Sequence, residues 1–217
     1  MFMNLQSNQL AKRSDLHILR KIWHVTTGCF CLYLYYHLDF DRQFWAWIAF
    51  IVAALGFVSD YLRLKNYYLN SLFVKYIGPI MRDSEKETFS GLPFYALGMS
   101  LSLFFYKEPI ALLSIFFLVL SDPISSLCGI LFGKDKIFPN KSVQGSLAGF
   151  FTCYLITLFF IVDSSSSNSI LLSFSIIAGV IGSLSELVSA YNVDDNLTIP
   201  VLSGLGLTII NYFFQVF

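Results

Sequence analysis

The sequence predicts an all-α, polytopic membrane protein with about seven transmembrane helices and one amphipathic helix at the membrane surface. Of its 217 residues, 56% are hydrophobic and only 13% are charged, whereas charged residues make up about 25% of an ordinary soluble domain. Apolar runs of about 17–25 residues recur, which is the length that a helix needs to cross a bilayer. The net charge is zero, so the composition gives no support to a nucleic-acid partner.

The candidate spans follow one another along the whole chain, without a repeat or a second domain. They cover about 20–38, 43–60, 90–106, 109–132, 145–162, 169–190 and 197–216. We therefore expect one integral-membrane domain over residues 1–217, in which residues 1–19 form a polar segment before the first span.

The basic residues predict which loops share a side of the membrane. If the N-terminus is cytosolic, 12 of the 14 Lys and Arg residues fall in cytosolic segments, and only Arg42 and Lys107 fall on the opposite side. This asymmetry follows the positive-inside rule. We therefore expect residues 61–89, 133–144 and 191–196 to face the cytosol.

The segment 61–89 is too long to be a turn between spans. Its apolar residues fall on one helical face at Leu69, Leu72, Phe73, Tyr76 and Ile80. This pattern is typical of a helix that lies in the membrane surface. A helix packed against other spans would show the same pattern.

Asp122 lies inside the fourth candidate span, in the stretch LSDPISSLCGILFGK. An ionisable residue in a span costs about 2.5–3.5 kcal/mol on insertion scales, which makes Asp122 a functional candidate. Pro123 follows it, and Asp before Pro suits a helix N-cap, so we expect the span to break there. The alternative is a proline kink with a locally hydrogen-bonded aspartate.

Further acidic residues fall on the same, cytosolic side. Glu186 lies near the cytosolic end of the sixth candidate span, and VDDNLTIP follows with Asp194, Asp195 and Asn196. Adjacent oxygen donors that can converge with another carboxylate suit Mg²⁺. The alternative is an Asx turn that caps the seventh span.

The stretch FGKDKIFPNKSVQGSLAGF, residues 132–150, combines positive charge with a possible helix start. Lys134, Lys136 and Lys141 supply charge, and a helix that begins near Ser142 and Gly145 would favour anions at its N-terminus. These are the features that a polyphosphate site needs. Positive-inside lysines followed by a GxxxG packing motif are the alternative explanation.

Two residues of the first span could reach the same side. Lys21 and His24, in RKIWH, share a helical face at the cytosolic end. A single histidine is more often a packed or interfacial residue, but with basic neighbours it could contact phosphate.

In their order, these motifs resemble the CTP-dependent lipid kinases, a family that includes dolichol kinase, phytol kinase and the yeast-type diacylglycerol kinase. The resemblance runs from about residue 20 to the C-terminus and is carried by RKIWH, SGLPFYALG, LSDPISSLCGILFGK, KSVQGSLAGF and DDNLTIP. The set is more distantly similar to CDP-diacylglycerol synthase. Gln144 stands where that synthase usually has Glu, and its long signature around the late aspartates is missing, which favours a kinase.

The resemblance implies transfer of the γ-phosphoryl group of CTP to the hydroxyl of a membrane lipid, such as diacylglycerol or a polyprenol, at the cytosolic face. It implies a triphosphate site at Lys134, Lys141, Ser142, Gly145 and Ser146, with Lys21, His24 and Asn196 as further contacts. It implies that Mg²⁺ is held by Asp122, Asp194 and Asp195, and that Glu186 or Asp195 takes the alcohol proton.

Two other functions remain open at this point. A cytidylyltransferase would make a CDP-lipid and pyrophosphate from the same substrates. A non-enzymatic seven-helix transporter would bind its solute at broken helices near the midplane. The polar residues of this chain crowd one side of the membrane, which argues against a transporter.

Overall fold

The computed structural model of the protein describes residues 17–162, 164, 167–191 and 193–217, so most of the expected N-terminal segment 1–19 lies outside the described residues. Helices dominate the described part, as expected of an all-α protein. In chain order they are α1 (Ile18–His37), α2 (Arg42–Lys65), α3 (Tyr67–Ile77), α4 (Gly91–Phe105), α5 (Glu108–Phe116), α6 (Asp122–Phe132), α7 (Val143–Ile161), α8 (Asn168–Leu187) and α9 (Asp195–Phe214). Short turns complete the order: η2 (Gly78–Ile80), η3 (Asp83–Lys86), the π-helical η4 (Phe117–Ser121) and η5 (Val188–Tyr191).

Five helices of the described part are long and apolar enough to cross a membrane. They are α2, the continuous helix Glu108–Phe132, α7, α8 and α9. The helix α4 is apolar but has only 15 residues, and α1 is not among the five. An all-α, multi-pass membrane protein is therefore confirmed. Each of the seven predicted runs is helical, but seven as the number of spans is not confirmed.

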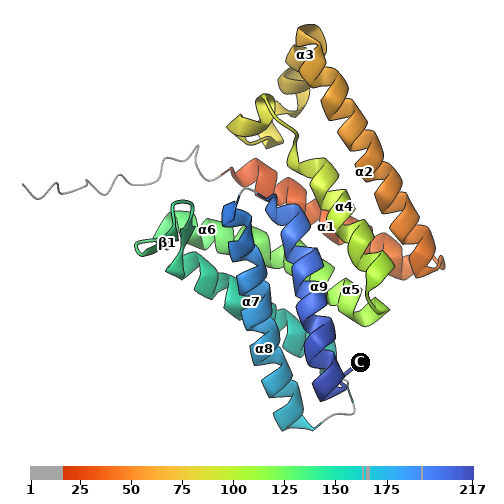
Figure 1. The fold of residues 1–217 in the computed structure, drawn as a ribbon, viewed down its shortest axis with the longest axis vertical. Coiled ribbons are helices and arrows are strands. Elements are labelled where there is room, and N and C mark those ends of the chain that lie inside the picture. The colour runs from red at the N-terminus through yellow and green to blue at the C-terminus, as the bar shows by residue number, and fades with distance from the viewer. Residues whose placement is uncertain (1–16, 163, 165–166, 192) are drawn as a thin grey trace, which may run out of the picture.

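The helices form one bundle with α2 and α3 at its edge (Figure 1). The helices α7, α8 and α9 pack side by side, α4 packs on α9, and α2 packs along α4. The turn η4 lies in the core, where Phe117, Leu118 and Val119 are fully buried. Because α1, α7 and α9 all contact η4, this turn fixes the start of α6 relative to its neighbours.

The expected break at Asp122 is wrong, because the helix continues through this point. Asp122 has helical backbone angles, φ −57° and ψ −52°, and Pro123 is the second residue of α6. The π-helical turn η4 stands immediately before them. A wider π turn carries the helix past a proline without ending it, and such turns are frequent at functional sites.

The segment 61–89 is helical over a shorter range than expected. The helix α2 continues to Lys65, and α3 begins after Asn66, whose side chain accepts hydrogen bonds from the N–H groups of Tyr68 and Leu69. Leu69, Leu72 and Phe73 of the predicted apolar face line a surface pocket with the end of α2. No residue of α3 is buried, so the helix rests on α2 with most of its surface exposed.

The expected loop 132–150 forms a hairpin followed by a helix. The strand β1 (Lys136–Phe138) pairs antiparallel with β2 (Lys141–Ser142), and α7 begins at once. The Ser142 side chain caps α7 by accepting from the N–H group of Gly145. The predicted helix start at Ser142 is confirmed.

Candidate active site

The acidic residues that the sequence singled out come from three helices. Asp122 begins α6, Glu186 stands one residue before the end of α8, and Asp194 and Asp195 stand at the start of α9. In Figure 1 the end of α8 and the start of α9 lie at the part of the bundle from which the β hairpin projects. Basic side chains from the hairpin, from the loop before η3 and from α1 meet them there.

Lys141 and Glu186 form an ion pair that links two of the predicted motifs. The Lys141 Nζ lies 2.8 Å from Glu186 Oε1, and the two side chains are only 16% and 6% exposed. Burial by itself would lower the pKa of Lys141, but the carboxylates of Glu186, Asp195 and Asp122 raise it overall. Lys141 is therefore held as a cation among the carboxylates.

A second ion pair joins Arg82 to the acidic start of α9. Its guanidinium donates to Asp195 Oδ1 at 3.1 Å and Oδ2 at 3.0 Å, and Nη1 lies 3.7 Å from Asp194 Oδ2. Burial would lower the pKa of Arg82, yet Asp195, Asp122 and Asp194 raise it. In the sequence, Arg82 is only one of several basic residues on the predicted cytosolic side, and nothing there predicts this role.

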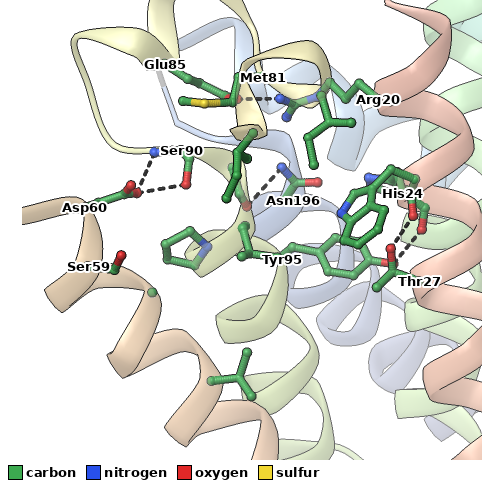
Figure 2. A pocket seen from close by; sticks show the side chains of 18 of the residues that line it. Arg20, His24, Thr27, Ser59, Asp60, Met81, Glu85, Ser90, Tyr95 and Asn196 are labelled. Carbon is green, nitrogen blue, oxygen red and sulfur yellow. Dashed lines mark hydrogen bonds and ion pairs between the residues drawn. The ribbon is translucent and has the colours of Figure 1, made fainter. Parts of the chain in front are cut away.

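Arg82 is held in place through Glu85. Glu85 Oε2 accepts a hydrogen bond from the Arg82 N–H at 3.2 Å, and its Oε1 accepts from Arg20 Nη1 at 2.6 Å. Arg20 belongs to α1, so Glu85 joins α1 to the loop that carries Arg82. Figure 2 shows the Arg20–Glu85 pair.

A buried pair at the end of α2 anchors the same loop from the other side. Arg63 Nε donates to Asp60 Oδ1 at 2.6 Å, and both side chains are almost completely buried. Asp60 Oδ2 also accepts from the N–H and hydroxyl groups of Ser90, and Arg63 donates to the main-chain oxygens of Glu85 and Thr88. Breaking such a pair would leave a buried charge without a partner, which costs several kcal/mol.

Asp194 caps α9 and faces the site as well. Its Oδ1 accepts from the Asn196 N–H at 3.0 Å and from Asn196 Nδ2 at 2.7 Å, as expected of a capping Asx turn. Burial, followed by the negative charge of Asp195, raises the pKa of Asp194 to about 6. The capping role and a place in the acidic cluster therefore occur together.

Asp122 faces ionisable side chains from four other segments of the chain. Asp195, His24, Lys141 and Arg82 all lie within electrostatic range of it. Within the described part of the chain, its carboxylate makes no hydrogen bond or ion pair with another residue. A carboxylate held among charges but not bound by them suits a ligand that arrives from outside the chain.

Two predicted residues of α1 lie beside this cluster. Lys21 is within electrostatic range of Asp122 and Asp195. His24 Nε2 donates to the main-chain oxygen of Leu118 at 3.0 Å, and its ring meets the edge of Tyr95. His24 therefore helps to hold α1 on the π turn, which is the packing role that was its alternative.

The remaining predicted triphosphate residues make contacts with other parts of the chain. Lys134 is exposed on the hairpin, where its N–H donates to the Gln144 side chain. Gly145 packs so closely that a Cβ there would lie 3.0 Å from the Ser125 main-chain oxygen. Ser146 contributes its main-chain oxygen to a hydrogen bond from Ser183. In this region the alternative of close helix packing describes Gly145 well.

The donors suit Mg²⁺ in their chemistry. Within the described residues, no group of three or more His, Cys, Asp or Glu side chains is placed to hold a metal ion. Mg²⁺ usually takes only one or two carboxylates and completes its shell with water and substrate phosphates. Asp122 and Asp195 are two carboxylates within electrostatic range of each other, which agrees with that number.

Comparison with known proteins identifies the family. The model of the cytidylyltransferase family matches residues 9–191. This chain belongs to that family. Relatives named CTP-dependent diacylglycerol kinase 1 come from Saccharomyces cerevisiae, 34% identical over 87% of this chain and 71% of the relative, and from Schizosaccharomyces pombe, 33% identical over 94% and 96%. No solved structure matches the chain.

Members named for other lipid alcohols are less similar. A probable phytol kinase 2 of Oryza sativa subsp. japonica is 27% identical over 91% of this chain and 68% of the relative. The resemblance to CTP-dependent lipid kinases that the motifs indicated is thereby confirmed.

Proposed function

We propose that the protein transfers the γ-phosphoryl group of CTP to the hydroxyl of a membrane lipid alcohol, giving a lipid monophosphate and CDP. The observation that carries the proposal is the cluster of Arg82, Lys141, Asp122 and Asp195 at one end of a membrane bundle. Diacylglycerol is the acceptor we favour, because the yeast relatives are named for it and the phytol relative is less similar.

The cluster supplies what phosphoryl transfer needs. Catalysis of this reaction depends on positioning and charge neutralisation more than on covalent chemistry. Lys141 and Arg82 are now neutralised by Glu186 and Asp195. A nucleotide phosphate offers both cations a second anionic partner. The planar guanidinium of Arg82 and the compact ammonium of Lys141 both suit phosphate oxygens.

The carboxylates divide into two roles in this proposal. Asp122 and Asp195 would hold Mg²⁺ together with phosphate oxygens, and Asp194 would support Asp195 from the helix cap. Mg²⁺, when bound, would neutralise charge on the phosphates. The alcohol proton would pass to Glu186 or Asp195. The site would face the cytosol, on the side that carries most of the basic residues.

The test is the fate of labelled CTP in purified protein reconstituted with diacylglycerol, a polyprenol or phytol. Label on the γ-phosphate should appear in the lipid product, and label on the α-phosphate should not. An α-labelled lipid would show instead that the protein makes a CDP-lipid. Asp122→Asn, assayed in parallel, shows whether the activity belongs to this site.

A further inference from the structure

We propose that a cavity between α1, α2, α4 and the segment 73–81 binds the acceptor lipid, with its hydroxyl directed toward Arg20 and Asn196. This proposal rests on the proposed function and adds a place for the second substrate. The cavity measures about 380 Å³, within the range of about 300–1,000 Å³ that is usual for small-molecule sites. It is large enough for the glycerol part of a lipid and the first carbons of its chains.

The walls of the cavity are apolar and come from several helices. They include Trp23 of α1, Val52 and Leu55 of α2, Phe73 of α3, and Leu92 and Pro93 of α4. Trp23, Leu55 and Leu92 are 50%, 65% and 49% exposed, although all three are large apolar residues. Leu55 belongs to α2, which can cross the membrane, so its exposed side chain is expected to face lipid chains.

The cavity also runs along α2, a candidate membrane span. Val52 lies near the middle of α2, and Asp60 lies near its end. Eight residues of helix correspond to about 12 Å. The cavity therefore extends from the middle of a spanning helix to the end of the bundle that carries the charges, as the chain and head of a lipid would.

Figure 2 shows the polar end of this cavity, and residues that line it are neighbours of the candidate active site. Arg20, Glu85 and Asn196 line it. Asn196 directly follows Asp195, and Glu85 accepts the N–H of Arg82. A lipid hydroxyl at this end would therefore lie next to the Arg82–Asp195 pair.

The same cavity is poorly suited to CTP. Of the residues that line it, Arg20 is the only Lys or Arg, and its guanidinium is bound to Glu85. A triphosphate needs several cations or N–H groups, and the apolar walls offer none beyond this one side chain. Lys141 and the hairpin, which do not line the cavity, provide the other approach to Asp195 and Asp122. The geometry thus separates the two substrates on either side of the carboxylates.

The experiment fills the cavity with a larger side chain and measures the KM for each substrate separately, with the protein in nanodiscs. Leu55→Trp should raise the KM for diacylglycerol about tenfold or more, on the scale by which apolar pockets reject a misfitting group, and leave the KM for CTP unchanged. Val58→Trp is the matched control, because Val58 is also an exposed residue of α2 but does not line the cavity. It should leave both constants unchanged.

A binding measurement without CTP makes the location testable apart from turnover. Diacylglycerol with a diazirine near the head of one acyl chain should crosslink to peptides of α1, α2 and α4, and Leu55→Trp should reduce that labelling. If the wild-type protein phosphorylates diacylglycerol but the crosslinks map to α7 and α8, the cavity proposal is overturned and the proposed function stands. If no lipid alcohol is phosphorylated, both fall.

Discussion

Arg82 donates to both carboxylate oxygens of Asp195, although 113 positions separate the two residues in the chain. The planar fork of a guanidinium matches a carboxylate and a phosphate equally well. The pair thus neutralises the largely buried carboxylate of Asp195. In the proposed mechanism, the Arg82 guanidinium of this pair also binds nucleotide phosphate. Glu85 and the Asp60–Arg63 pair fix the loop from which Arg82 projects.

Replacing Arg82 should reduce catalysis strongly. Loss of one preorganised electrostatic donor typically lowers kcat by about 10²–10³, so we expect Arg82→Ala to fall in that range. Arg82→Lys keeps the charge but loses the fork, and we expect it to recover only part of the rate. Initial rates at saturating CTP and lipid measure the effect.

The matched control for Arg82 is Lys86→Ala. Lys86 belongs to the same loop but pairs with the exposed Asp83. Exposed pairs contribute about 0–1 kcal/mol, so its rate should change by less than about fivefold. Both variants lose one positive charge from the side predicted to be cytosolic, so equal effects would indicate that Arg82 acts only on membrane orientation.

Lys141 and Lys136 provide a second comparison within one hairpin. Lys141 is bound to Glu186 among the carboxylates, whereas Lys136 is exposed. Lys141→Ala should lose roughly 3–4 kcal/mol of transition-state stabilisation, which is on the order of a few hundredfold in rate. Lys136→Ala should lose far less. Equal, small losses at matched amounts of inserted protein would contradict a role of the hairpin in phosphate binding.

The contrast between Lys141 and Arg82 shows how far the sequence reaches. Glu186 and Asp122 stood out because a polar residue in an apolar run needs a reason to be there. Lys141 stood out because it directly precedes a predicted helix start at Ser142. Arg82 lies in a segment rich in polar and basic residues, where one more arginine carries no such signal. Only the fold brings it to Asp195.

The π turn and the cavity escaped prediction for a related reason. Asp122–Pro123 resembles a helix start in sequence, but packing of Phe117, Leu118 and Val119 in the core keeps the helix continuous. Hydropathy locates a helix without stating how its turns are wound. The cavity is a space between α1, α2 and α4. The sequence gives the order of these helices along the chain but not the distances between them.

Asp122 and Asp195 should be needed for activity in the presence of Mg²⁺. Asp122→Asn and Asp195→Asn keep shape but lose charge, and each should lower turnover by about a hundredfold or raise the Mg²⁺ requirement, as loss of a metal ligand does. Asp135→Asn is the control, because Asp135 is exposed on the hairpin. Rates over a range of Mg²⁺ concentrations measure the effect. Normal activity of either variant at low Mg²⁺ would remove that residue from the metal site.

Asp194 should make the stability of the metal-free protein depend on pH. Its folded pKa is about 6, above the ordinary 3.8, so between these values the folded state binds more protons than the unfolded state. The free energy of unfolding should therefore fall as pH rises from about 4 to about 6. Above about pH 6 this loss of stability should be complete. A difference of about two pKa units corresponds to a loss of roughly 3 kcal/mol in the free energy of unfolding.

Asp194→Asn should remove this slope and raise stability above pH 6. The amide oxygen can still accept from the Asn196 N–H, so the helix cap is kept. Thermal unfolding in detergent with a chelator, followed by tryptophan fluorescence, measures the difference. Asp83→Asn should leave the slope in place, since Asp83 is fully exposed and Lys86 lowers its pKa. If the pH dependence of stability persists in Asp194→Asn, it belongs to another titratable group.

The two ends of the bundle should lie on opposite sides of the membrane. The helix α8 joins Ser167 to Glu186 over 20 residues, or about 30 Å, the thickness of the hydrocarbon core. Ser84 lies in η3, beside the Arg82 loop and hence at the Glu186 end. At the other end of the bundle, Arg42 donates to the main-chain oxygen of Tyr106. Arg42 therefore lies beside the turn formed by residues 106 and 107.

Single cysteines at exposed Ser84 and Ser167, in a background without native cysteines, test this arrangement. Ser167→Cys should react with an impermeant maleimide in intact cells, and Ser84→Cys should react only after permeabilisation. The reverse pattern would place the active site on the outer face, where cytosolic CTP cannot reach it. Labelling of both from the same side would show that α8 does not cross the membrane, so the charged cluster could not mark one membrane face.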